Sequence, residues 1–222
     1  GGGYSAIPET CPVSPAGGQV LVDETVERIT KLFNDLEISL PEEGQLIAVE
    51  PGGETICSRG TPFRFYVQGG DPTRVVIDFQ GGGACWNDLT CSLADAIFND
   101  SAGTLEEITA YREQGLLSGI YEFENPENPF YGWTLVHVPY CTGDVHWGNA
   151  ETTYGQASNQ FTIQHKGYTN ALAAMSWVTH HLESPSKIAV TGCSAGGYGS
   201  LVWGAWLMEH YPQSSVVQFS DS

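Results

Sequence analysis

Basic side chains are scarce in this chain: Lys and Arg together number 8 among 222 residues, against 26 Asp and Glu. The resulting formal net charge of −18 repels polyanions, so nucleic acids and anionic membrane surfaces are poor partners. Such an excess of acid is typical of a solubilising surface. The composition therefore disfavours any function that requires binding to a polyanion.

Long apolar runs and metal-binding cysteine pairs are also missing. No apolar stretch reaches the roughly 18 residues that a membrane-spanning helix needs, and the six cysteines include no Cys-x-x-Cys pair. We therefore expect no membrane span, no metal and no other cofactor. The remaining composition, 41% hydrophobic and 15% charged, is that of a folded globular domain.

The cysteines that are present favour an exported protein, secreted or periplasmic, over a cytosolic one. Cys85 and Cys91 bracket a short loop and are predicted to form a disulfide. Cys11 paired with Cys57 would tie down the N-terminal arm. Cys193 is expected to be a buried free thiol.

The pattern of the chain predicts an α/β fold. Residues 1–18 are expected to be a flexible arm, and residues 19–222 the N-terminal part of a single α/β-hydrolase domain. Apolar residues recur at helical spacing within 23–36, and strand-like runs then alternate with helical ones. This alternation predicts a mostly parallel sheet with helices on both faces, incomplete in this chain.

Individual elements are predicted from the same pattern. Gly69–Asp71 is expected to join two strands as a hairpin, and Ser92 and Thr104 to cap helices. The proline-containing stretch 121–133 suits a rim or lid, and His137 is interpreted as a core histidine rather than a catalyst. The predicted strands are 45–50, 63–70, 74–81, 133–140, 187–192 and 214–220, and the later helices are 165–182 and 198–211.

Ser194 is the candidate nucleophile. It lies in the pattern Gly192-x-Ser194-x-Gly196, after a β-branched strand and before a helix, as in a nucleophile elbow. The N-terminus of that helix would stabilise an alkoxide or a tetrahedral oxyanion. The alternative is a glycine-rich turn with a purely structural role.

A second glycine stretch, 81–83, follows the predicted strand 74–81 in the position of an oxyanion-hole loop. Consecutive glycines let neighbouring N–H groups turn inward without steric conflict. We assign the oxyanion donors to Gly82 and Gly83, together with the N–H of Ala195. The alternative is a merely flexible turn.

Four blocks together, "QGGGACWN", "VPYCTGDVHWGN", "HKGYTNALAAMSWV" and "VTGCSAGGYGSLVW", resemble the pectin acetylesterase and Notum carboxylesterase family over about residues 45–222. The resemblance implies secreted serine carboxylesterases of the α/β-hydrolase type, which remove acetyl groups from polysaccharides or a fatty acyl group from a protein. It implies the same roles for Ser194, Gly82, Gly83 and Ala195. The animal branch carries an aromatic residue near positions 83 and 84, where this chain has Gly83 and Ala84, so the lipid specificity of that branch is not expected.

The charge narrows the substrate further. A protein at −18 is not drawn to polyanionic, de-esterified pectin, so the family name does not identify the substrate. The resemblance implies an acyl ester, acetyl or another short chain, of a carbohydrate or of another small alcohol. Asp144 and His146 follow a predicted strand and belong at the same sheet edge as the elbow. They are either substrate-binding residues or a local structural pair.

A serine esterase also needs a histidine base and an acid. After Ser194 the chain offers only Glu209, His210 and Asp221. The first two lie roughly 15 residues along a helix, about 20 Å from Ser194 at ~1.5 Å per residue, which is too far. Asp221 is the candidate acid, and the histidine is expected beyond residue 222, in the C-terminal remainder of the same protein.

Two other interpretations stay open. The first is an enzyme complete in this chain, with His146 as the base and an unusual chain order. The second is a non-catalytic binding module that retains the hydrolase scaffold.

Overall fold

The structure, a computed structural model, describes residues 38–221, the side chains of residues 94 and 95 excepted. The predicted arm, the predicted helix within 23–36 and Cys11 lie outside these residues. In the part described, no helix is both long and apolar enough to cross a membrane.

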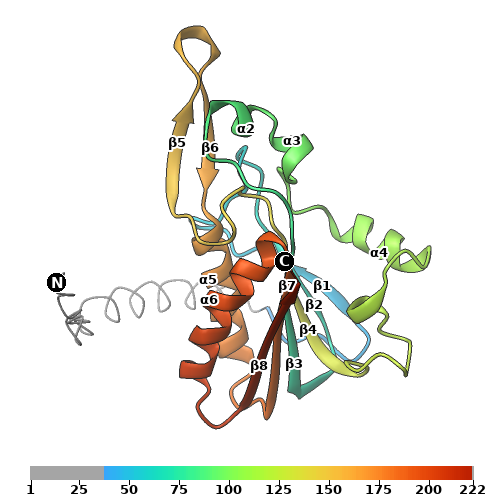
Figure 1. Cartoon of the computed structure of the whole chain (residues 1–222). Helices are drawn as coiled ribbons and strands as arrows, with labels where there is room; N and C mark the ends of the chain where they lie inside the picture. Colours follow the sequence, from blue (N-terminus) through green and yellow to red (C-terminus); the bar gives the residue numbers. More distant parts are fainter. Residues whose placement is uncertain (1–37, 222) are drawn as a thin grey trace, which may run out of the picture.

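A six-stranded mixed sheet forms the body of the domain, in the order β1-β2-β4-β3-β7-β8 (Figure 1). β3 runs parallel to its neighbours β4 and β7, and β8 runs parallel to β7, whereas β1 and β2 join antiparallel at the other side. The strands are β1 (Leu46–Val49), β2 (Phe65–Gln68), β3 (Asp71–Phe79), β4 (Trp133–Val138), β7 (Lys187–Cys193) and β8 (Ser215–Asp221).

Helices lie on both sides of this sheet, as the sequence predicts. The long helices α5 (Gly167–His181) and α6 (Ala195–His210) cover one face, and α4 (Leu105–Glu113) lies on the other (Figure 1). The shorter elements are α2 (Asp88–Ser92), α3 (Ala94–Ile97), η1 (Gly119–Tyr121) and η2 (Ala157–Asn159). The mostly parallel α/β architecture is thus confirmed.

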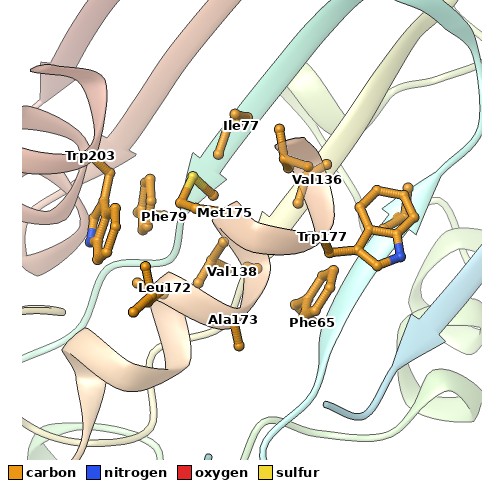
Figure 2. Packing of buried hydrophobic residues seen from close by; sticks show 14 of the residues in the cluster. Phe65, Ile77, Phe79, Val136, Val138, Leu172, Ala173, Met175, Trp177 and Trp203 are labelled. Carbon is orange, nitrogen blue, oxygen red and sulfur yellow. The ribbon is translucent and has the colours of Figure 1, made fainter. Parts of the chain in front are cut away.

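The period-2 alternation of strands sorts side chains between the two faces. Ile77 and Phe79 of β3 join the large core under α5 and α6, whereas Val76 joins a smaller cluster on the opposite face. Figure 2 shows the large core, with α5 side chains packed against the buried strands. Its labelled members are Phe65, Ile77, Phe79, Val136, Val138, Leu172, Ala173, Met175, Trp177 and Trp203.

Two local predictions are wrong. β2 and β3 do not form a hairpin, because β4 lies between them in the sheet. The Asp71 N–H donates to the Gly132 carbonyl and begins the β3–β4 ladder where a hairpin would turn. Ser92 ends α2 instead of starting a helix; Thr104 does cap α4, through a capping box with Glu107.

A two-stranded antiparallel ribbon, β5 (Ala150–Tyr154) and β6 (Phe161–His165), projects from the body beside α2 (Figure 1). The ribbon is not predicted from the sequence, because its strands are short and largely polar. The Gly155 N–H donates to Asp88 on α2, and Arg59 lies over the Phe161 ring. These contacts fix the ribbon against α2.

Two disulfides join distant and local parts of the domain. Cys85–Cys91 forms as predicted. Cys57 is bonded to Cys141 and not to Cys11, because the end of β4 brings Cys141 to a Cα–Cα distance of 5.1 Å. Two disulfides are typical of a protein from an oxidising compartment.

Candidate active site

Ser194 occupies the turn between β7 and α6 and is the N-cap residue of the helix. Its φ of 52° and ψ of −120° are strained for a residue with a Cβ. A serine held in such a strained strand-to-helix turn is typical of a nucleophile elbow. Because Ser194 is also exposed, it is accessible to a substrate at the positive end of a 16-residue helix.

The two glycines of the elbow permit contacts that no side chain would allow. A Cβ on Gly196 would lie 1.9 Å from the carbonyl oxygen of Phe79, at the end of β3. A Cβ on Gly192 would lie 2.2 Å from the carbonyl oxygen of Gly196. The first turn of α6 therefore packs directly on the backbone of the central strands.

The neighbouring strand β8 also holds the elbow. Asp221 lies opposite Cys193 in the ladder, and its carbonyl accepts the Ser194 N–H at 2.7 Å. The Asp221 side chain is exposed beside the end of β7. Among the residues described, no histidine is hydrogen-bonded to Ser194 or to the Asp221 carboxylate. The candidate acid is therefore near the elbow, without a base between them.

The glycine loop lies against the elbow, as expected for an oxyanion loop. A Cβ on Gly81 would lie 2.4 Å from the Cys193 carbonyl oxygen, and one on Gly82 would lie 2.7 Å from the Tyr140 ring. The Gly83 N–H, predicted to face the substrate, instead donates to the Ile97 carbonyl at 2.9 Å. The carbonyl of Ile97, the last residue of α3, thus accepts the Gly83 N–H, which is not free to bind a substrate.

Gly82 and Ala195 remain as candidate donors. Ala195 is the first residue of α6, so its N–H has no acceptor within the helix.

His146 lies beneath the glycine loop. Its Nε2 contacts the Gln80 carbonyl at 2.9 Å, just before the three glycines. The ring packs edge-on against Phe79 and so close to α6 that a Cβ on Gly199 would lie 2.9 Å from it. Burial lowers the pKa of His146 to about 4. A neutral imidazole that binds Gln80 supports the structural alternative for this residue over a substrate-binding role.

Asp144, like His146, is hydrogen-bonded to other parts of the protein. One carboxylate oxygen accepts the Thr142 hydroxyl at 2.7 Å, and the other accepts the N–H of Gly167, the first residue of α5, at 2.7 Å. Burial raises the pKa of Asp144, although these hydrogen bonds oppose the shift. Its contacts also support the structural alternative, in which Asp144 fixes the start of α5.

Cys193 is a free thiol, as expected, but it is exposed rather than buried. It ends β7 next to the elbow, where the chain leaves the sheet. Cys85, Cys91 and His165 form the one group of potential metal-ligand atoms within the described residues. The disulfide occupies both sulfurs of that group.

A polar cluster that was not predicted from the sequence joins β3, β4 and η1. Asp78 and His137 are register partners on β3 and β4, and His137 Nδ1 lies 2.8 Å from Asp78 Oδ2. The Tyr121 hydroxyl contacts both side chains. The sequence signal was one ionisable residue within the apolar run of each strand, Asp78 in VVIDF and His137 in TLVHV. His137 is indeed mostly buried, though it faces α4 rather than the large core.

Comparison with known proteins adds the family. A family model described as Pectinacetylesterase matches residues 43–222. Pectin acetylesterase 5 of Arabidopsis thaliana is 29% identical over 64% of this chain and 32% of its own length, and pectin acetylesterase 4 of the same plant is 26% identical over 63% and 32%. The palmitoleoyl-protein carboxylesterase notum2 of Xenopus laevis is 26% identical over 66% of the chain and 29% of its own length. The alignments thus span about a third of each relative.

Proposed function

Because the chain belongs to the pectinacetylesterase family, we propose that it supplies the nucleophile and the oxyanion hole of a serine carboxylesterase. The proposed substrates are short-chain acyl esters, such as acetyl esters of carbohydrates. The observation that carries the proposal is the strained backbone of Ser194 at the N-terminus of α6. The names of the relatives support the reaction class.

The reaction follows from the position of the serine. Ser194 Oγ attacks the ester carbonyl carbon, and its proton passes through a base to the leaving alcohol as the C–O bond breaks. Water then attacks the acyl-enzyme by the same route and releases the acid. The N–H groups of Ala195 and Gly82 stabilise the oxyanion in both steps. The Gly83 N–H would join them only if it left the Ile97 carbonyl.

The base comes from outside the chain in this proposal. A histidine, and an acid unless Asp221 serves, belong to a C-terminal remainder of the same protein that meets the elbow beside β8. His146 is a poor base because its Nε2 is already bonded to the Gln80 carbonyl. The two disulfides agree with a secreted or periplasmic enzyme.

Covalent labelling tests the nucleophile. A fluorophosphonate probe incubated with the full natural polypeptide should label one serine in the tryptic peptide that contains Ser194. Ser194→Ala should abolish labelling and nearly all hydrolysis of 4-nitrophenyl acetate, with little loss of stability, because the side chain is exposed. Ser158→Ala, at an exposed serine of the β5–β6 turn, is the matched control and should retain both.

Each possible outcome bears on the proposal. Labelling that persists in Ser194→Ala refutes the assigned nucleophile. A folded wild-type protein that neither reacts with the probe nor hydrolyses esters favours the non-catalytic binding module. A loss of turnover in Asp221→Asn with labelling merely slowed supports Asp221 as the acid.

A further inference from the structure

Asp78, His137 and Tyr121 form a hydrogen-bonded cluster, in which Asp78 is the acceptor. Asp78 Oδ2 accepts hydrogen bonds as a carboxylate oxygen, and the Tyr121 hydroxyl and His137 Nδ1 both lie within hydrogen-bond distance of it. Burial and the neighbouring Asp78 raise the pKa of Tyr121, which keeps its phenol protonated. The tautomer in which His137 Nδ1–H donates to Asp78 leaves Nε2 as the acceptor of the ring.

No described residue is hydrogen-bonded to this Nε2. The ring lies between Tyr66, which stacks on it at 6.3 Å, and Tyr121, which meets it edge-on at 5.5 Å. Its side chain is 13% exposed, and His137 lines a cavity between the sheet and α4. The open acceptor is therefore held on the wall of that cavity.

The cavity itself is apolar and of small-molecule size. Its volume is about 330 Å³, within the range typical of ligand pockets. Aromatic and aliphatic side chains make up most of its wall, and the polar groups on it belong to His137, Gln80 and the tyrosines, of which Tyr66 and Tyr121 already donate their hydroxyls to Ala102 and Asp78. The lining residues are Leu46, Tyr66, Gln80, Ile108, Tyr111, Leu117, Tyr121, Phe123, Leu135 and His137.

The charge around the cavity restricts what could enter it. α4 and the segment that follows it, up to residue 127, border the cavity and contain one basic residue, Arg112. Arg112 already pairs with Glu124 at 3.1 Å. The acidic residues of the same stretch are Glu106, Glu107, Glu113, Glu122, Glu124 and Glu127. An anionic ligand would be repelled there.

From these contacts we propose that the cavity binds a neutral single-ring aromatic compound bearing a hydroxyl group, whose O–H donates to Nε2 of His137. The aromatic wall accommodates the ring, the open acceptor takes the hydroxyl, and the acidic border excludes carboxylates. This site does not depend on the proposed esterase activity. It touches the glycine loop only through Gln80, the residue before Gly81.

Calorimetric titration of the full natural polypeptide tests the proposal with three ligands of one shape. 4-Methylphenol should bind measurably, and toluene about fivefold more weakly because one hydrogen bond of about 1 kcal/mol is lost. 4-Methylbenzoate should bind more weakly than toluene. The ¹⁵N resonance of His137 Nε2 should shift with 4-methylphenol and not with toluene.

Substitutions locate the binding. Leu135→Trp should fill the cavity and abolish binding of 4-methylphenol, whereas Leu89→Trp, at a residue that is 70% exposed, should leave it unchanged. Ser194→Ala should also leave it unchanged, which separates this site from the esterase proposal. Equal affinity for 4-methylphenol and toluene, binding that survives Leu135→Trp in a folded protein, or no binding to the folded full polypeptide would each overturn the proposal.

Discussion

His146 shows how one buried side chain supports the candidate active site without facing a substrate. It joins three segments that are distant in sequence: the loop after β4, the residue before the glycine loop, and the first turns of α6. The Trp147 indole adds a hydrogen bond to the Tyr198 carbonyl at 3.0 Å. At the residue scale, the position of the glycine loop thus depends on a histidine that must stay neutral.

The stability of the domain should therefore fall in acid partly because of His146. Its pKa is about 4 when folded, below the ordinary value of 6.5. Between pH 6.5 and 4 the unfolded chain binds a proton that the folded chain does not, so stability is lost as the pH falls through this window. The 2.5-unit difference corresponds to roughly 3 kcal/mol. Urea unfolding should show that His146→Gln loses less free energy of unfolding than the wild type between pH 6.5 and pH 4, by about this amount.

Two comparisons isolate this effect. Asp144 has a raised pKa and the opposite pH dependence, but it is present in both proteins, so the difference between them removes its contribution. His180→Gln, at an exposed histidine, should stay close to the wild type, because His180 adds only the smaller cause of the lowered pKa of His181 and burial gives the larger one. A wild-type and a His146→Gln protein with parallel pH dependence would contradict the assigned role.

At the scale of elements, the two disulfides constrain very different lengths of chain. Cys57–Cys141 closes a separation of 84 residues and ties the segment before β2 to the end of β4. Cys85–Cys91 closes a separation of 6 residues and packs beneath Phe98 and Tyr140. Chain entropy gives roughly 4–5 kcal/mol for the first and roughly 2 kcal/mol for the second.

Replacing each pair by alanine should separate stability from activity. Cys57→Ala/Cys141→Ala should lose about twice as much free energy of unfolding as Cys85→Ala/Cys91→Ala, measured in urea at pH 7. Gly82 and Gly83 come directly before this disulfide loop, so its variant should lose kcat more than it raises KM. Equal destabilisation by the two pairs, or an unchanged kcat in the second variant, would contradict this.

The sequence predicts what is local and periodic, and misses what depends on packing. The elbow at Ser194, the Cys85–Cys91 loop and the buried strands follow from neighbouring residues. The Cys57–Cys141 bond, by contrast, exists because β4 inserts between β2 and β3, which no local pattern reveals. Likewise the Ile97 carbonyl reaches the Gly83 N–H only because α3 folds back on the glycine loop.

At the scale of the whole molecule, β8 is an edge strand of the sheet formed by the described residues. Phe219 stacks on Phe130, yet it remains 45% exposed, and Val217 is 53% exposed. Unpaired edge strands with exposed apolar residues favour association with another chain segment. This surface fits the proposal that further polypeptide pairs with β8 and brings the missing histidine to Ser194.

Residues 1–222 produced alone should therefore be inactive and prone to association. The chemical reason is the absent base, and the physical reason is the open edge of β8. Hydrolysis of 4-nitrophenyl acetate and light scattering measure the two effects. The full natural polypeptide, prepared in parallel, should be active and monodisperse. Vigorous turnover by a monomer of 24.0 kDa would contradict both expectations.

The central position of β3 also affects when parts of the domain can fold during synthesis. Arg74 of β3 pairs with Lys187 of β7, which lies 113 positions later in the chain. The ladder between β3 and β7 therefore cannot form until β7 has been synthesised. At about 5–20 residues per second of synthesis, that delay is roughly 6 to 20 seconds. Pairings so distant in sequence also close slowly. The turn at Ser194, which is built on the end of β7, therefore cannot form until late in the synthesis of the described residues.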